Sequence, residues 1–176
     1  FYGLFGFLLI VFVVLKIFSS KSKLLKYTTQ TIIGIILLLF LVHTAGLGIR
    51  WYISGHAPWS DAYEAIIYVA WATMFFGLFL GRKSSLTIGA ATFVSSIILM
   101  IALGNWLDPE IANLKPVLNS WWVLVHVSII VASYGPFSLG MILGVIALLL
   151  IIFTSEKNKK KMELYIKEVT VVNEMV

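Results

Sequence analysis

Cysteine is absent from this sequence, and charged residues are scarce. Without cysteine the chain cannot form thiolate metal sites, Cys-X-X-Cys redox pairs or the Cys-X-X-Cys-His attachment site of a c-type cytochrome. Charged residues make up only 12% of the 176 residues, whereas about a quarter is usual in soluble domains. Together with 60% hydrophobic residues and a mean hydropathy of +1.00, this composition predicts an integral membrane protein.

Several patterns that carry chemistry are also missing. The sequence has no nucleophile–base pair, no carboxylate pair and no phosphate-binding glycine loop, so a self-contained hydrolase or ATPase is not predicted. The net charge is +5, but the lysines cluster at segment ends and form no basic face with interleaved aromatic residues. We therefore expect no nucleic-acid partner.

What the sequence does contain is a series of apolar segments, which predicts an all-α, polytopic fold with about five transmembrane helices. At roughly 20 residues per span, the predicted spans cover residues 1–18, 28–49, 62–80, 84–103 and 119–153. The last one is longer than a bilayer core requires, and Gly135-Pro136 should kink or break it. Gly140 and Gly144 form a Gly-X-X-X-Gly pair that would allow another helix to pack closely.

The remaining residues, 154–176, are predicted to be a basic cytoplasmic connector that leads toward a further span outside this chain. We accordingly expect the chain to be a fragment of a longer polypeptide. The orientation follows from the lysine and arginine residues, all of which except Arg50 and Lys115 lie on one side of the predicted membrane. By the positive-inside rule, that side is cytoplasmic, and the loops around residues 55–56 and 108 are external.

The segment at residues 119–137 holds one histidine, His126, about 10 Å below the external face at about 1.5 Å per residue. An ionisable side chain inside a membrane segment is costly and often functional, and imidazole is a common ligand of haem iron. Trp122 lies one turn above His126 on an otherwise apolar face, which suits a flat hydrophobic macrocycle. The alternative is a histidine hydrogen-bonded between helices, with Trp121 and Trp122 as ordinary interface anchors.

Two other histidines and one arginine are weaker candidates. His43 lies about seven residues inside the outer end of the second span and could be a second ligand or a hydrogen-bonding partner. His56, between Gly55 and Pro58, is expected to order a turn. Arg50 could contact a haem propionate or a lipid phosphate. The acidic residues of the outer loops are interpreted as helix caps and solvated charges, and they are Asp61, Glu64, Asp108 and Glu110.

Two stretches resemble the CcsA part of System II cytochrome c synthases, some of which are fused to a CcsB part as CcsBA. They are residues 50–64, RWYISGHAPWSDAYE, and residues 114–134, LKPVLNSWWVLVHVSIIVASY. In that family, a histidine of the second stretch is one of a pair that ligates haem at the external face, and by motif this is His126. The partner histidine follows a tryptophan-rich external segment, and neither is present in these residues.

The resemblance implies a haem lyase, in which the thiols of a Cys-X-X-Cys-His apocytochrome c add to the vinyl groups of haem b. His126 would be the axial ligand, while Trp121, Trp122 and Tyr134 would line the haem pocket. The implied partners are apocytochrome c, a CcsB-like part, the remaining C-terminal part of the CcsA-like region and the lipid bilayer. The implied location is the bacterial inner membrane, with the haem site toward the periplasm and this fragment alone insufficient for activity.

Three alternative functions remain open at this point. The first is a haem transport or haem-binding subunit without ligation activity. The second is a b-type electron-transfer cytochrome, for which only His43 and His126 offer a facing pair. The third is a generic permease subunit, for which discontinuous helices or internal symmetry would be expected.

Overall fold

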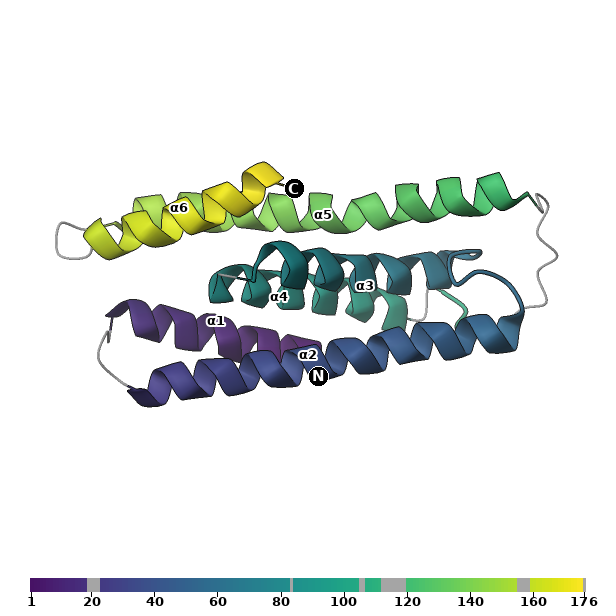
Figure 1. Cartoon of the computed structure of the whole chain (residues 1–176), viewed down its shortest axis with the longest axis horizontal. Helices are drawn as coiled ribbons and strands as arrows, with labels where there is room; N and C mark the ends of the chain where they lie inside the picture. Colours follow the sequence, from purple (N-terminus) through teal and green to yellow (C-terminus); the bar gives the residue numbers. More distant parts are fainter. Residues whose placement is uncertain (19–22, 83, 105–106, 112–119, 155–158, 176) are drawn as a thin grey trace.

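The computed structural model is a bundle of long helices, and it describes residues 1–18, 23–82, 84–104, 107–111, 120–154 and 159–175 (Figure 1). Within these ranges there is no β-strand, which confirms the predicted all-α fold. The helices are α1 Tyr2–Phe18, α2 Lys23–Ser54, α3 Ala62–Leu80, α4 Ser85–Leu103, α5 Trp121–Ile152 and α6 Lys159–Met175.

The helices form three layers (Figure 1). Helices α3 and α4 make up the middle layer, with α1 and α2 on one side and α5 and α6 on the other. The most extensive packing joins α3 to α4, α1 to α4 and α3 to α5. The end of α2 and the starts of α3 and α5 lie at one end of the bundle, which we call the outer end in keeping with the predicted orientation. The opposite end, where α1, α3 and α5 finish, is the inner end.

Four of these helices, α2 to α5, are long and apolar enough to cross a membrane. Helix α1 is apolar from Tyr2 to Leu15 but is shorter than the other four. The chain is therefore a multi-pass helical membrane protein, as predicted. Residues 159–175 of the predicted connector form α6, which folds back along α5 (Figure 1). Helix α6 buries one stripe of apolar side chains, at Met162, Val169 and Val172.

The helix ends follow local capping chemistry. Asp61 caps α3 by accepting a hydrogen bond from the Glu64 backbone N–H at 2.6 Å, and Ser84 caps α4 by accepting from Thr87 N–H. Helix α3 has the bounds predicted for the third span. Helix α2 extends past the predicted residues 28–49 at both ends, because a helical backbone can continue into polar residues beyond the hydrocarbon core. Gly55, with φ of 68°, turns the chain after α2.

Helix α5 runs through Pro136 without interruption, so Gly135-Pro136 does not break the helix, and the predicted kink stays a prediction. Gly135 is buried because α5 lies close to the backbone of α3 at this point. An added Cβ would lie 2.6 Å from the Thr73 nitrogen. A β-carbon at Gly144, in contrast, would meet nothing within 4 Å, so that half of the predicted glycine pair has no close helix partner among the described residues.

Small side chains also allow α4 to lie at the centre. Ala90, Ala91 and Ser95 are fully buried on it, and the Ser95 hydroxyl donates to the Ala70 carbonyl of α3 at 2.9 Å. Such residues let helix backbones approach closely in a membrane, where packing and interhelical hydrogen bonds drive association.

Some predictions fall outside the described residues. These are the start of the last span at residue 119, the motif residues 114–119, and the basic residues Lys21, Lys83, Lys115 and Lys157.

Candidate functional site at the outer end

His126 lies on the second turn of α5, on the side of the helix that faces away from the bundle. The buried side of α5 is marked by Gly135, Leu139 and Leu143. At about 100° per residue, the separation of nine positions places His126 and Gly135 on opposite sides of the helix. The His126 side chain is exposed, and no hydrogen-bond or ionic partner for it is found among the described residues.

The aromatic residues predicted to line a haem pocket are exposed as well, but only Trp122 is about one turn from His126 on the same side of α5. At about 100° per residue, Trp121 lies on another side of the helix, and Tyr134 is more than two turns further along. Trp121 is 75% exposed, Trp122 79% and Tyr134 55%. Ile129 and Phe137 extend the same exposed apolar surface along α5. We call this surface, formed by Trp122, His126, Ile129, Ile130, Tyr134 and Phe137, the His126 face.

His43 is in a different environment. Its Nδ1 lies 3.5 Å from the Tyr2 hydroxyl of α1, and the two rings are tilted against each other with centroids 5.9 Å apart. The imidazole thus links α2 to α1. This is the role of hydrogen-bonding partner that the sequence left open for His43 beside a ligand role. Helices α3 and α4 lie between α2 and α5 (Figure 1), so His43 and His126 do not form a facing pair for one haem.

His56 orders the outer loop, in agreement with the sequence interpretation. It is 8% exposed, its backbone carbonyl accepts from the Ser54 hydroxyl at 3.0 Å, and its Nδ1 lies 3.3 Å from the Ala57 carbonyl. The same nitrogen is 3.5 Å from Glu64 Oε2.

Glu64 is at the centre of a polar network that sequence reasoning missed. Among the acidic residues interpreted as helix caps and solvated charges, Glu64 belongs to the cap, because its backbone N–H donates to Asp61. Its side chain is not solvated but 0% exposed. Its Oε1 accepts from Arg50 Nε at 2.9 Å, and its Oε2 accepts from the Ser60 backbone N–H at 3.1 Å. A buried carboxylate requires such partners, since an unpaired buried charge is strongly unfavourable. Arg50 and Glu64 thereby join the end of α2 to the start of α3.

Arg50 has further partners on the loop that follows α4. Its Nη1 donates to the Pro109 carbonyl at 3.0 Å and its Nη2 to the Glu110 carbonyl at 3.4 Å. The guanidinium also lies over the Tyr63 ring, 5.0 Å from its centroid. The predicted contact between Arg50 and a haem propionate stays a prediction, and it would require this guanidinium to exchange one of these partners.

Aromatic rings line the surface between α2 and α3. Trp71, Phe75 and Phe79 stack at intervals of four residues along α3, with ring centroids 5.5 and 6.1 Å apart. At the outer end, Trp59 and Tyr68 continue the series at 4.9 Å. A cavity of about 290 Å³ lies there, and it is lined by Thr44, Leu47, Gly48, Trp51, Pro58, Trp59, Tyr68 and Trp71. Trp121, Trp122 and Tyr134 do not line this cavity.

Of the three histidines, His126 best fits a haem ligand. Haem iron needs an imidazole nitrogen that is not already engaged within the protein, and the flat macrocycle needs apolar surface beside it. His126 meets both requirements because it is exposed on the His126 face. His56 is buried in the outer loop and His43 is part-buried beside α1, so neither offers an open imidazole beside an exposed apolar surface. The described residues contain no group of three or more His, Cys, Asp or Glu that could hold another metal ion.

The fold and this site define a polytopic helical membrane protein with an exposed, histidine-bearing apolar face near one end. Comparison with known proteins identifies the particular family. Residues 59–176 match the cytochrome c assembly protein family, and the chain belongs to that family. The match covers α3 to α6 and so includes His126.

Individual relatives extend the similarity into α2. Protein NrfI of Wolinella succinogenes is 42% identical over 138 residues, which are 78% of this chain and 15% of that protein. The cytochrome c biogenesis protein CcsA of Aethionema cordifolium is 36% identical over 74% of this chain and 43% of the relative. CcsA of Synechococcus sp. (strain CC9311) is 33% identical over 83% of this chain and 48% of the relative. The chain thus spans less than half the length of these relatives.

Proposed function

We propose that this chain is part of a membrane cytochrome c synthase that binds haem b near the external face and presents it to apocytochrome c. The observation that carries the proposal is the exposed His126 imidazole, which has no partner among the described residues. The membership of the chain in the cytochrome c assembly protein family supports it, as do relatives that are named for cytochrome c biogenesis.

In this proposal the protein positions its substrates and supplies no nucleophile. Each thiol of the Cys-X-X-Cys-His motif of apocytochrome c would add its S–H across one vinyl group of the haem substrate, so a thioether forms without an oxidant. His126 would ligate the iron from one side, and Trp121, Trp122 and Tyr134 would cover the macrocycle. Holding the reacting groups in place in this way removes much of the entropic barrier to their reaction.

The second axial ligand and the partners are also part of the proposal. Because α3 and α4 lie between α2, which carries His43, and α5, which carries His126 (Figure 1), we propose that the second ligand is not His43 and comes from outside the described residues. A CcsB-like part and the remaining C-terminal part of the CcsA-like region would complete the synthase. We place it in the bacterial inner membrane, with the His126 face toward the periplasm.

The test uses the purified full-length protein with His126 changed to alanine. We expect the haem content, measured by the pyridine haemochrome assay, to fall sharply and the yield of mature cytochrome c to fall with it. Added imidazole should partly restore the absorption spectrum, which loss of folding would not allow. His43→Ala is the matched histidine control and should keep the haem spectrum of the wild type.

Two results would count against this assignment. Unchanged haem content and cytochrome c yield in His126→Ala would exclude the ligand role. Loss of haem with an unchanged yield of cytochrome c would favour a haem-binding or transport subunit without ligation activity.

A further inference from the structure

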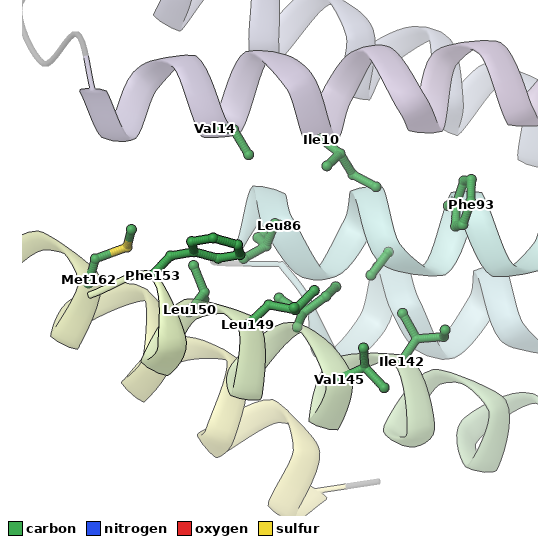
Figure 2. Close-up of a pocket in the computed structure, with 12 residues that line it drawn as sticks. Ile10, Val14, Leu86, Phe93, Ile142, Val145, Leu149, Leu150, Phe153 and Met162 are labelled. Atoms are coloured by element: carbon green, nitrogen blue, oxygen red, sulfur yellow. The ribbon is translucent and has the colours of Figure 1, made fainter. Parts of the chain in front are cut away.

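A second cavity lies toward the inner end of the bundle, where α1 and α5 finish and α6 starts. Figure 2 shows the side chains that line it. Its volume is about 490 Å³, and α1, α4, α5 and α6 all contribute to its wall. The side chains in its wall are all apolar; they include Ile10, Phe93, Ile142 and Phe153. In size the cavity falls within the range of about 300–1,000 Å³ that is usual for ligand sites.

The geometry points to a phospholipid site, in which the cavity holds an acyl chain and the lysines at the start of α6 hold the phosphate of an anionic headgroup. The wall has no polar group to orient a polar ligand and no histidine to ligate iron. Along α5 the wall runs from Ile142 to Phe153, which is about 16 Å at 1.5 Å per residue. This length is close to half of the roughly 30 Å hydrocarbon core, the depth that one acyl chain covers.

Charge at the inner end determines which lipid fits. Met162 of α6 is part of the cavity wall, and Lys159 precedes it by three residues, so both lie on one side of the helix. Lys159 and its neighbour Lys160 are exposed, and within the described ranges neither has a carboxylate within 4.0 Å. Lysines at the cytoplasmic ends of membrane helices attract anionic headgroups. An anionic phospholipid therefore fits both features, because its acyl chain would fill the apolar cavity and its phosphate would pair with the lysines.

The side chains in Figure 2 show how such a chain would enter. Ile10 and Val14 project from α1 toward the space above α5, while Val145, Leu149 and Phe153 approach it from α5. Val145 is 47% and Phe153 69% exposed, so this side of the cavity opens onto the surface of the bundle. A lipid could exchange with the bilayer through this opening.

The test measures phospholipid retention by native mass spectrometry of the purified full-length protein, with phosphatidylglycerol and phosphatidylcholine offered together. We expect the wild type to retain one phosphatidylglycerol per chain in preference to phosphatidylcholine. Val145→Trp, which fills the cavity, should lower retention at least about tenfold. Tenfold corresponds to about 1.4 kcal/mol, which is less than the contribution of two buried methylene groups. Leu148→Trp is the matched control because Leu148 lies on the same helix, is 62% exposed and is not part of the cavity wall.

The headgroup is tested separately, which also covers the case in which Val145→Trp does not fold. Lys159→Gln together with Lys160→Gln should reduce the preference for phosphatidylglycerol by at least about fivefold. Fivefold is the effect of losing about 1 kcal/mol, the contribution of a single lysine near an anionic headgroup. Lys167→Gln, further along α6, should leave the preference unchanged. Equal retention of both lipids by the wild type, or equal effects of Val145→Trp and Leu148→Trp, would overturn the assignment. Absence of any retained lipid would do so too, and would favour a protein segment as the occupant.

Discussion

The buried pair of Arg50 and Glu64 allows a quantitative prediction about what holds the outer end together. Arg50→Met removes the guanidinium but keeps most of the apolar stem. It leaves the fully buried Glu64 carboxylate with the Ser60 N–H at 3.1 Å and the His56 ring at 3.5 Å. Removing one partner of a buried ion pair typically costs about 3–5 kcal/mol. Because the Ser60 N–H and the His56 ring stay beside the carboxylate, the loss of stability should be near the lower end, about 3 kcal/mol.

Thermal unfolding in detergent, followed by the helical circular-dichroism signal, provides the measurement. For a protein of this size, each kcal/mol shifts the midpoint by about 2–4 °C, so a loss of about 3–5 kcal/mol corresponds to roughly 6–20 °C. Arg82→Met is a matched control. Arg82 lies over the Phe79 ring and donates to the Phe79 carbonyl, but it has no carboxylate partner in the part of the chain that the structure describes.

The double variant Arg50→Met, Glu64→Met distinguishes the energy of the interaction between the two side chains from the effects of removing each side chain alone. Because it leaves no unpaired buried charge, its midpoint should fall by less than the sum of the two single shifts. Arg50→Met unfolding within about 2 °C of the wild type, a loss of about 1 kcal/mol or less, would refute the reasoning. The pair would then contribute no more than an exposed ion pair does.

Two further predictions concern helix packing. Gly135→Ala should destabilise the protein by about 1–3 kcal/mol, because its Cβ would clash with the α3 backbone at Thr73. Gly144→Ala has open space around it and should be neutral or slightly stabilising. Equal unfolding midpoints for the two variants would contradict the predicted clash. Burial, reinforced by the Glu168 carboxylate, raises the pKa of Tyr165 in α6. The stability linked to Tyr165 should therefore be complete below about pH 10, its usual pKa, and should be lost as the pH rises through the folded-state pKa. Unfolding midpoints of the wild type and Tyr165→Phe should diverge in that alkaline range, and parallel curves would show that Tyr165 is not buried against α5.

The positions of the helices could be predicted because their causes are local. The predicted third span, residues 62–80, coincides with α3, since Asp61 caps its start and an apolar run fills its length. The ends of α2 were harder to predict. Hydropathy stops at the first polar residues, but the backbone continues as helix to Ser54. A pattern that marks the hydrocarbon core therefore underestimates a helix that extends into the interface.

The pairing of side chains could not be predicted in the same way. Arg50 and Glu64 are 14 residues apart on two helices, and only the fold brings the end of one beside the start of the other. Sequence reasoning therefore interpreted Glu64 as one of the helix caps and solvated charges and did not predict its ion pair, whereas its side chain is buried. One signal was available. Arg50 is one of only two basic residues assigned to the outer side, and an arginine at the end of an apolar span often pairs with an acidic residue.

The three histidines show why the candidate site needed the structure. Helix α5 is hydrophobic all round, so its sequence does not identify a buried side. The close contact at Gly135 identifies that side, and His126 lies opposite to it, on a surface that combines an imidazole with exposed tryptophan and isoleucine. Lipid tails can cover the apolar residues of such a surface, but they offer no hydrogen-bond or metal partner to the imidazole. The proposed role as a haem ligand would give this imidazole the partner that lipid does not provide.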